Sequence, residues 1–479
     1  MGLHTPVSTT TMSTTKATIR PGVVGTLSTP ESLDKLRELL IRDGKEHHCF
    51  SNDRGLHNHL SHHLVSACDM GATPKQLEEI FEKEARGERP IGNIGVPLDE
   101  MRWQARLGDR NAYGAYLVFF TDQIAKKGVT KTLEDWLMSA PANFNGASMF
   151  SRFFGGAMHP LLHVGFGVEL GLDSLVAQGL AMCATSEGDF VSVVGDHWSP
   201  AMPKIPEVPT KGVTLFSILR QVYDSPDLVP ALPYVPSDAS GAGFYELCHS
   251  PVHTHALRSL YSKWSIDTTL EGAAFDAEID KRVEEAYWQA VLFTAGLGRT
   301  GREPRVDFFL VHTLTSAIVL PRLLDVLPQK VHKVQMLQGY ARASALWLVA
   351  RGRARINPSL LMSYSNDPAP ASLKTSNVTD PWTPIITNGL RFFDSHVIKT
   401  IRALYFGQIR YGKVAAGQVI GTFDKSGKET HTGLAELDGT AWIRAAGILH
   451  LALGWSSFDN AAVMWDRSGL GWDAAWELE

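Results

Sequence analysis

Apolar residues recur every three to four positions along most of this chain, the spacing that places them on one face of an α-helix. One such segment follows Thr29-Pro30 and ends at Gly44, and another follows Thr73-Pro74. Threonine before proline is typical of a helix start, because the threonine side chain caps free N–H groups and proline fits the first turn. Further helical patterns cover residues 160–184, 282–295, 306–327, 331–352, 384–407 and 440–454.

Alternating apolar and polar residues, the pattern of a half-buried strand, are scarce. Residues 189–195 and 412–423 are the best strand candidates. We therefore predict a mainly α fold, a large single-domain helical bundle over residues 30–479 that follows a flexible, Ser- and Thr-rich tail at residues 1–29. Residues 199–256 interrupt the helices, because eight prolines lie between Pro200 and Pro236 and proline breaks helices. This Pro-rich excursion is either a lid or a plain surface loop.

Composition excludes several classes of protein. Of the 479 residues, 44% are hydrophobic and 20% charged, and the formal net charge of −5 argues against nucleic-acid or membrane-surface binding, which needs a basic face. No apolar run reaches the ~18 to 20 residues of a membrane span. The four cysteines form no CxxC pair, which excludes a disulfide scaffold and a thiolate zinc site. We expect a cytoplasmic protein that binds neither nucleic acid nor membranes. The sequence does not indicate its oligomeric state.

A glycine-rich segment, Gly296-Leu-Gly298-Arg-Thr-Gly301, matches the spacing of a dinucleotide-binding loop. That loop needs a preceding strand and a helix that opens inside it. Here a helical pattern precedes the glycines and Pro304 follows them, so we interpret the segment as a turn between helices. The sequence contains no other motif typical of a flavin or nicotinamide site.

The histidines are unevenly distributed and provide the strongest chemical signal. The chain has 18, and six of them lie between His47 and His63. In a helix, His59 shares a face with His62 and His63. Three further helical segments place histidines beside apolar residues: the pair His159 and His163, the single His312 after Phe308 and Phe309, and His396, which shares a face with Lys399.

A shared metal ion would explain these histidines together. Every buried imidazole nitrogen needs a partner, and one metal satisfies a nitrogen of several rings at once. Helix bundles build metal sites in this way, from inward side chains of facing helices. Each histidine taken alone is better explained as a core residue or as part of a solvated face. The run of His249, His253 and His255 is a second, weaker candidate for zinc.

These segments together resemble the questin oxidase-like family. The resemblance runs from about residue 46 to about residue 455, in the family's order, and is carried by His57-Asn58-His59-x-x-His62-His63, His159-Pro-Leu-Leu-His163-Val-Gly-Phe-Gly-Val-Glu169, Phe308-Phe309-Leu-Val-His312 and Asp394-x-His396-Val-x-Lys399-x-x-Arg402. It implies an oxygenase of fungal secondary metabolism that opens the central ring of an anthraquinone or a related polycyclic aromatic polyketide.

Two mechanisms fit the implied reaction. A Baeyer–Villiger monooxygenase uses flavin and NADPH, and the family has been described in these terms, but this sequence carries no fingerprint for either cofactor. Imidazole ligands suit iron, copper and zinc, of which only iron and copper activate O₂. We therefore expect a non-heme Fe(II) oxygenase with O₂ as co-substrate. The alternatives are the NADPH-dependent monooxygenase and a non-redox protein, either a zinc hydrolase or a non-catalytic helical binding protein.

The predicted metal ligands are His59, His163, His312, His396 and Lys399. The ammonium of Lys399 would repel a metal, whereas a carbamate formed with CO₂ would supply an anionic oxygen. The alternative is a lysine that pairs with Asp394 or reaches solvent. His62 and His159 are alternates, because each shares a helix face with a predicted ligand. Whichever of them does not bind metal would act as a base on a phenolic hydroxyl of the substrate.

Polar and aromatic side chains near the histidine segments are predicted to support the site. Asn58 and Glu169 are predicted to orient the ligand imidazoles through hydrogen bonds. Four aromatic residues are predicted to form either a flat slot for a polycycle or ordinary core: Phe153, Phe154, Phe392 and Phe393.

Overall fold

The computed structural model describes residues 19–52, 55–92, 95–188, 190–194, 213–230, 234, 242–374, 379–455 and 464–477. Within these residues the chain is built almost entirely of helices, and its β-type pairings are isolated bridges. The prediction of a mainly α fold is confirmed. No helix in the described ranges combines the length and the apolar character that crossing a membrane requires.

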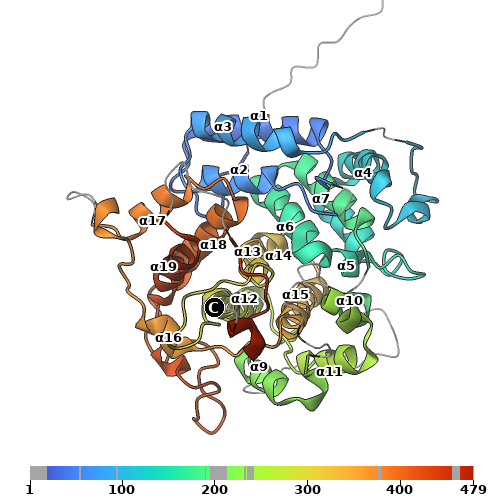
Figure 1. Ribbon diagram of the computed structural model, residues 1–479. Helices are drawn as coiled ribbons and strands as arrows, with labels where there is room; N and C mark the ends of the chain where they lie inside the picture. Colours follow the sequence, from blue (N-terminus) through green and yellow to red (C-terminus); the bar gives the residue numbers. More distant parts are fainter. Residues whose placement is uncertain are drawn as a thin grey trace, which may run out of the picture.

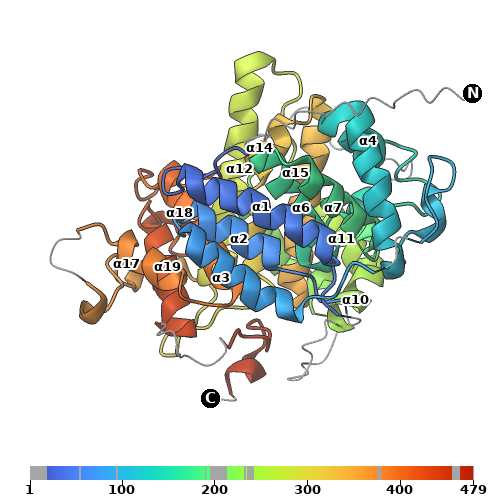
Figure 2. The same cartoon turned by 90° about the horizontal axis from the view of Figure 1, so that it is seen from above.

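The N-terminal helices form a layer along one side of the molecule (Figures 1 and 2), namely α1 (Pro30–Glu46), α2 (Leu60–Asp69) and α3 (Pro74–Glu84). Two of them begin as the sequence predicted. The side chains of Thr29 and Thr73 accept hydrogen bonds from the N–H groups of Ser32 and Gln76, and a proline occupies the first helical position in both. These caps satisfy donors that would otherwise lack a partner at the helix start.

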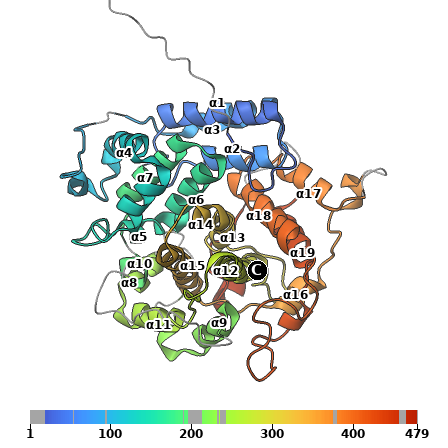
Figure 3. The same ribbon diagram turned by 180° about the vertical axis from the view of Figure 1, so that it is seen from behind.

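The longest helix, α12 (Gly272–Ala295), lies near the middle of the molecule with α15 (Lys330–Ala350) beside it (Figures 1 and 3). The other helices pack around this pair. Their bounds are α4 (Tyr113–Leu133), α5 (Met149–Arg152), α6 (Gly155–Leu170), α7 (Asp173–Thr185), α8 (Val191–Val194), α9 (Leu215–Asp224), α10 (Ala242–His249), α11 (Pro251–Tyr261), α13 (Val311–Ala317), α14 (Leu320–Asp325), α16 (Pro358–Ser363), α17 (Trp382–Gly389), α18 (Ser395–Tyr411) and α19 (Ala441–Leu453).

Four helices from distant parts of the sequence pack against one another: α2 contacts α6 and α18, and α13 contacts the same two helices. Fully buried apolar side chains join them, including Leu64 of α2, Leu161 of α6 and Ile398 of α18. Each such side chain stabilises the fold by roughly 1.5 to 3 kcal/mol. This packing brings the predicted histidine segments together.

Both strand predictions were wrong. Residues 191–194 form α8, and residues 189 and 195 lie outside the described part of the chain. A short buried apolar run cannot be assigned to helix or strand by periodicity alone. Residues 412–423 form turns, because Gly417 and Gly421 adopt left-handed φ angles of 76° and 86° that reverse the chain direction.

The Pro-rich excursion is only partly described, because residues 195–212, 231–233 and 235–241 lie outside the described ranges. The remainder contains α9, α10 and α11, of which α10 and α11 contact α15 and α9 contacts α12. Ile218, Leu219 and Leu257 of these helices are fully buried. A role of this excursion as a lid stays a prediction.

Part of the predicted N-terminal tail packs against the helices. Arg20 donates from its backbone N–H to the Leu170 carbonyl at 2.8 Å, and Val24 donates in the same way to Asp69 Oδ2 at 3.0 Å. Ile19 and Val24 are buried. Residues 19–29 are therefore held by bonds to the ends of α2 and α6, so the helical unit begins earlier than residue 30. Residues 1–18 lie outside the described ranges.

Candidate metal centre

Four histidines from four distant segments meet where α2, α6, α13 and α18 pack together. His59 precedes α2, His159 lies near the start of α6, and His312 and His396 are the second residues of α13 and α18. One ring nitrogen of each histidine lies within 4.8 Å of the corresponding nitrogens of the others. In the described part of the chain, this is the one group of at least three His, Cys, Asp or Glu side chains with the spacing of metal ligands.

In each of the four rings, Nδ1 faces an oxygen that only accepts hydrogen bonds. The partners are the carbonyl of His57 (2.6 Å from His59), the carbonyl of Gly156 (for His159), the carbonyl of Phe308 (2.9 Å from His312) and the carboxylate of Asp394 (2.8 Å from His396). Each Nδ1 must therefore carry the ring proton. All four rings present an unprotonated Nε2 to a common centre.

These Nε2 atoms have no donor from which to accept. Nε2 of His312 and of His396 are buried without a hydrogen-bond partner among the described residues. Nε2 of His59 and of His159 lie 2.8 Å apart, so two lone pairs face each other. A buried polar atom without a partner costs roughly 1 to 3 kcal/mol. A cation at the common centre would satisfy all four atoms.

Burial keeps these imidazoles neutral. It lowers the pKa of His59, His159 and His312 well below the ordinary value, and the nearby histidines and Lys399 lower it further. Burial, followed by the charge of Lys399, also lowers the pKa of His396, although Asp394 opposes this shift. Neutral imidazole is the form that binds a metal.

Lys399 lies one turn after His396 on α18 and is 1% exposed. Burial lowers the pKa of its ammonium group to about 7. Its Nζ atom has no hydrogen-bond partner among the described residues, so the side chain neither reaches solvent nor bonds to Asp394. An amine without a partner therefore lies among the histidines, and its unprotonated form is the one that reacts with CO₂.

His163, a predicted ligand, lies outside the four-histidine group. Its Nδ1 is 3.3 Å from Nε2 of His62, and its Nε2 is 3.3 Å from Oε1 of Gln178. His159, predicted as the alternate on the same helix face, is the residue whose nitrogen belongs to the group. The ring of His62 stacks on that of His159 with centroids 5.6 Å apart. The histidine of α6 that joins the group is therefore His159, the predicted alternate, and not His163, the predicted ligand.

A left-handed turn accounts for this exchange. Gly156, Ala157 and Met158 have φ angles of 53°, 55° and 66° directly before His159. Residues that carry Cβ avoid this region, at a cost of roughly 1 to 3 kcal/mol each. The turn brings the Gly156 carbonyl onto Nδ1 of His159 and so sets the tautomer of that ring. Strain of this kind clusters at functional sites.

The outer side of His396 is held by Asp394 and Trp465. Oδ1 of Asp394 accepts from both the backbone N–H and Nδ1 of His396, at 2.8 Å each, and Oδ2 accepts from Nε1 of Trp465 at 2.7 Å. Although burial opposes the shift, the bonds from His396 and Trp465 hold the pKa of Asp394 well below its usual range. A carboxylate in this position orients a metal-binding imidazole and raises its basicity.

Phe308, Trp465 and Arg467 cover the same side of the histidines. The Phe308 ring centroid is 5.4 Å from His312 and 4.9 Å from His396, and Cζ of Arg467 lies 3.8 Å over Phe308. Arg467 is exposed and pairs with no carboxylate in the described ranges. Trp465 and Arg467 also line a cavity of about 440 Å³. Neither was predicted from the sequence, because no motif or spacing links them to the histidine segments.

The supporting roles of Asn58 and Glu169 were predicted wrongly. The Asn58 side chain donates to Asp43 Oδ1 at 3.0 Å and accepts from the backbone of Leu60 at 2.8 Å. Glu169 accepts from Arg402 and from the backbone of Val23. Glu169 is thus paired with an opposite charge and Asn58 is engaged by Asp43 and the start of α2, and neither side chain bonds to the four histidines.

The predicted aromatic slot is not formed either. Phe153 and Phe154 are fully buried and pack against each other with ring centroids 5.9 Å apart. Phe392 is buried against His450, whereas Phe393 is exposed with the Lys83 ammonium 3.1 Å above its ring. The two pairs therefore lie in different surroundings. Phe153, Phe154 and Phe392 are buried core residues, which was the alternative prediction, and Phe393 is on the surface.

The second histidine run has hydrogen-bond partners inside the protein. Nδ1 of His253 lies 2.7 Å from the Ser250 hydroxyl and Nε2 lies 2.9 Å from the Val229 carbonyl. Nδ1 of His249 lies 2.8 Å from the Tyr245 carbonyl. With both nitrogens engaged, His253 has no lone pair free for zinc, and this run forms no metal group within the described residues.

Comparison with known proteins finds similar chains. The family model described as Questin oxidase-like matches residues 56–404, which include the four histidines and Lys399. The chain is 23% identical over 424 residues to questin oxidase of Aspergillus terreus, covering 87% of this chain and 86% of that one. It is 26% identical over 441 residues to Baeyer-Villiger oxidase ptaJ of Pestalotiopsis fici (88% and 92% covered). It is 24% identical over 417 residues to Baeyer-Villiger monooxygenase dmxR6 of Cryptosporiopsis sp. (85% and 88% covered).

Proposed function

This chain belongs to the Questin oxidase-like family, and on that premise we propose that it is an iron-dependent oxygenase that cleaves a ring carbon–carbon bond of an anthraquinone-type aromatic polyketide. The chain is an oxidoreductase, as its relatives are named oxidases and monooxygenases. The observation that carries the finer proposal is the group of four neutral imidazoles whose Nε2 atoms share one centre.

Iron fits this set of donors best. Imidazole suits iron, copper and zinc, and a carboxylate-type oxygen in the set favours iron among the metals that activate O₂. The oxygens of Asp394 are already engaged by His396 and Trp465. We therefore propose that His59, His159, His312 and His396 bind Fe(II) together with a carbamate on Lys399. The bound iron would supply the electrons that activate O₂.

The carbamate would form from residues that are already in place. The unprotonated Nζ of Lys399 would attack CO₂, form an N–C bond and release one proton, which leaves an anionic carbamate on the side chain. A negatively charged carbamate would then stand beside the positive metal in place of a positively charged ammonium, which removes the repulsion between the two cations. Nuclear magnetic resonance after incubation with isotope-labelled CO₂ should show a carbamate signal that is absent from Lys399→Ala.

Once His159 joins the ligand set, the role of base falls to His62. Nδ1 of His62 is buried without a partner among the described residues, and its Nε2 lies 3.3 Å from Nδ1 of His163. Burial lowers the pKa of His62 well below its ordinary value, so the ring is neutral and its Nδ1 lone pair is free. We propose that His62 accepts the proton of a phenolic hydroxyl of the bound substrate. His163 and Gln178 would hold the ring in place.

The substrate would approach past Phe308 and Arg467. Phe308 is partly exposed beneath the guanidinium of Arg467, and this exposed positive charge would bind an anionic oxygen of the polycycle. His59 is the most exposed member of the four-histidine group, whereas the other three are buried.

A second candidate is a monooxygenase of the Baeyer–Villiger type, which the printed names of several relatives favour. The two reactions differ in oxygen and electron balance. A dioxygenase places both atoms of O₂ in the product and needs no external reductant. The monooxygenase places one atom in the product, reduces the other to water and consumes one NADPH. Turnover of an anthraquinone and of its hydroquinone under labelled O₂, with and without NADPH, distinguishes them.

Elemental analysis of the purified protein tests the metal directly. The proposal predicts about one iron per chain, and its loss in His312→Ala, because removing a ligand opens the metal shell. His431→Ala is the matched control, since His431 is also buried but bonds to the Phe216 carbonyl at 2.9 Å. Stoichiometric zinc without turnover would instead support the hydrolase alternative, and full iron in His312→Ala would refute the ligand assignment.

A further inference from the structure

Trp465 lies between the four-histidine group and a cavity at the protein surface. Its indole contacts the ring of His396, with centroids 5.9 Å apart, and among the described residues it is the one tryptophan or tyrosine whose ring contacts any of the four histidines. It also lines the cavity of about 440 Å³ together with the exposed residues Met464 and Arg467. Indole gives up a single electron more readily than imidazole does, so Trp465 is the most easily oxidised ring beside the proposed metal.

Two hydrogen bonds in series link this indole to the imidazole of His396. Nε1 of Trp465 donates to Oδ2 of Asp394 at 2.7 Å, and Oδ1 of the same carboxylate accepts from Nδ1 of His396 at 2.8 Å. Inside a protein, each bond of such a series polarises the next. The negative charge of Asp394 stabilises positive charge that develops on the indole, and its oxygen is in place to take the Nε1 proton. The carboxylate therefore favours the loss of an electron from Trp465.

Backbone pairing fixes Trp465 in this position. Phe308 donates from its backbone N–H to the carbonyl of Asp466 at 2.8 Å, and the N–H of Asp466 donates to the carbonyl of Val306 at 3.3 Å. Phe308 comes shortly before α13, whose second residue is His312. The segment that carries the indole is therefore tied to the segment that positions a proposed ligand.

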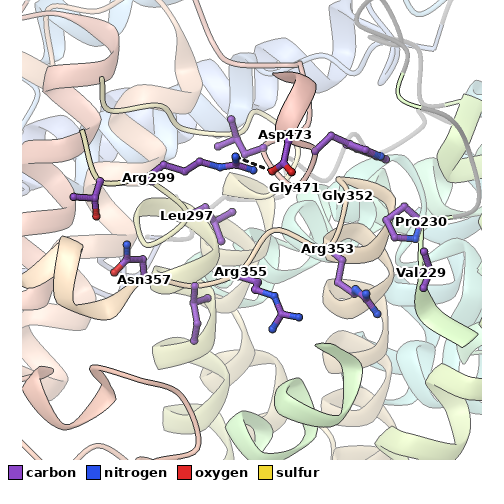
Figure 4. Close-up of a pocket in the computed structure, with 15 residues that line it drawn as sticks. Val229, Pro230, Leu297, Arg299, Gly352, Arg353, Arg355, Asn357, Gly471 and Asp473 are labelled. Atoms are coloured by element: carbon purple, nitrogen blue, oxygen red, sulfur yellow. Dashed lines mark ion pairs between the residues drawn. The ribbon is translucent and has the colours of Figure 1, made fainter. Parts of the chain in front are cut away.

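A larger cavity, of about 730 Å³, lies apart from this indole (Figure 4). Its lining includes the loops at residues 297–300, 352–357 and 470–473. Neither Trp465 nor any of the four histidines belongs to it. Its arginines are engaged within the fold, since Arg299 pairs with Asp473 at 2.8 Å and Arg353 donates to the Ser225 carbonyl at 2.8 Å. Of these two cavities, the smaller one is thus the one that borders a residue in contact with the histidines.

We propose that Trp465 protects the metal centre by giving up an electron when the centre is oxidised before a substrate is bound. This inference rests on the proposed function, because it needs an iron centre that reacts with oxygen. Without a bound polycycle the oxidant meets no substrate, and the groups nearest to it are the ligand imidazoles. An electron drawn from the indole instead confines the damage to a residue that is not a ligand. The cavity beside Trp465 lets a small reductant from solvent reach the ring.

The electron balance is closed with hydrogen peroxide as the oxidant. Peroxide accepts two electrons as its O–O bond breaks, one from ferrous iron, which becomes ferric, and one from the indole of Trp465. The Nε1 proton passes to Oδ2 of Asp394, which leaves a neutral indolyl radical and two hydroxide ions. A small thiol in the cavity restores the indole by giving up the hydrogen atom of its S–H bond, and becomes a thiyl radical. Without a thiol, the indolyl radical adds O₂ and the ring keeps oxygen.

Peptide mass spectrometry of the iron-loaded protein after exposure to hydrogen peroxide tests this role without measuring turnover. In the absence of substrate and thiol, we expect oxygen to be added to Trp465 at least about tenfold more than to Trp136, because a group held beside the metal reacts as in an intramolecular reaction. Trp136 is the matched control, since both tryptophans are 8% exposed and Trp136 donates from Nε1 to Gln123 at 3.1 Å. Electron paramagnetic resonance of samples frozen soon after mixing should show an indolyl radical in Trp136→Phe and none in Trp465→Phe.

Iron-free and zinc-loaded protein show whether the oxidation passes through the metal. Both should leave Trp465 unmodified, whereas Met464, which is 83% exposed, should be oxidised by peroxide in every sample. In Trp465→Phe with its iron site filled, oxygen added to the four histidines should rise several-fold, because the electron then comes from the ligands.

Three outcomes would overturn the inference while the oxygenase proposal stands. In protein whose iron content has been confirmed by elemental analysis, they are equal modification of Trp465 and Trp136, equal modification of Trp465 with and without iron, and unchanged modification of the histidines in Trp465→Phe. The first two comparisons use the parent protein, so they stay decisive even if Trp465→Phe binds iron poorly. A parent protein that binds no iron would instead refute the oxygenase proposal, and this inference with it.

Discussion

Helices α2, α6 and α18 each contribute to two buried polar clusters of opposite character. Near their N-terminal ends they carry histidines of the proposed metal centre, and further along they carry an ion cluster, Asp69, Glu169 and Arg402. Arg402 donates through Nε to Asp69 at 2.8 Å and through Nη2 to Glu169. These three side chains are at most 2% exposed, and His159, His312 and His396 are at most 8% exposed.

The two clusters differ in whether they contain both hydrogen-bond donors and acceptors. In the ion cluster, donors of Arg402 meet acceptors of Asp69 and Glu169, and the two carboxylates also accept from the backbone of residues 23–25. Only Nη1 of Arg402 and Oε2 of Glu169 have no partner among the described residues of this cluster. In the histidine cluster all four inward atoms are acceptors, and the nearby amine of Lys399 has no partner among the described residues. A cluster with both donors and acceptors can pair within itself, whereas four acceptors around one centre need an added cation. Burial alone does not separate these two cases.

The largest effect should come from a matched pair of variants on α6. His159→Ala should lose almost all bound iron and at least about 100-fold in activity, because loss of a ligand exceeds the 10- to 100-fold cost of disturbing a supporting residue. His163→Ala should keep about one iron per chain, since both nitrogens of His163 face His62 and Gln178. Metal content and turnover are measured for both. The reverse ranking would restore His163 as the ligand, as the sequence predicted.

Arg402→Met breaks the ion cluster and should cost stability rather than metal. Removing one partner of a buried ion group leaves the other charges uncompensated, at a cost of about 3 to 5 kcal/mol. Chemical denaturation measures the loss in the free energy of unfolding. Arg220→Met is the control, because that arginine is half-exposed, pairs with Asp224 at 2.9 Å and should contribute about 0 to 1 kcal/mol.

A triple variant with Arg402→Met, Asp69→Leu and Glu169→Leu sharpens the comparison. Replacing the entire ion group by apolar residues should recover part of the stability that Arg402→Met loses, because no unpaired charge remains. An apolar replacement of the four histidines should never recover iron. If the triple variant were less stable than Arg402→Met, the bonds to residues 23–25 would be the dominant contribution of this cluster.

Sequence reasoning predicted three of the four clustered histidines, and placed the fourth one helical turn away, because their signal is local. The positions of His59, His312 and His396 beside apolar residues show which faces of the helices turn inward. The choice between His159 and His163 depended on the left-handed turn at residues 156–158, which no periodicity predicts. The prediction that Glu169 orients the histidines failed for a similar reason. Its partner, Arg402, is distant in sequence and is brought close only by the packing of α6 and α18.

Contacts between distant segments were the other part that the sequence did not provide. Trp465 reaches Asp394, and through it His396, from beyond the residues that the family model matches. Residues 1–29 were predicted to form a flexible tail from their Ser- and Thr-rich composition, yet Asp69 and Glu169 accept hydrogen bonds from the backbone of residues 23–25. Hydrogen bonds to backbone leave no mark on side-chain spacing, and the bond of Trp465 joins segments 71 residues apart, so neither contact was predictable.

Trp465→Phe tests how far the histidine centre depends on its outer contacts. It removes the hydrogen bond to Asp394 but keeps an aromatic ring, so the affinity for iron should fall by about tenfold with little change in melting temperature. Trp136→Phe is the matched control, since Trp136 is also buried and donates to Gln123 at 3.1 Å. Equal iron affinity in both variants would show that Asp394 holds His396 without help.

The smallest effect concerns a carboxylate that has neither kind of partner. Glu88 is partly buried beside Asp43 and Glu84, and its Oε2 atom has no hydrogen-bond partner among the described residues. Burial, with the charges of Asp43 and Glu84, raises its pKa to about 8. The folded state therefore binds this proton more tightly than the unfolded state, whose glutamate has a pKa of about 4.3. The free energy of unfolding must then fall as the pH rises between these two values.

Glu88→Gln removes this titration, so it should match the parent protein near about pH 4, where both side chains are neutral, and exceed its stability near about pH 9. The gain should be about 1 kcal/mol, since the partial exposure of the side chain lets solvent screen most of the penalty. Chemical denaturation across this pH range measures it. A difference that stays constant with pH would mean that Glu88 has the same pKa in the folded and unfolded protein. In that case, water would satisfy the partly buried charge of Glu88. Arg402 is instead satisfied by carboxylates, and the four histidines would be satisfied by a metal.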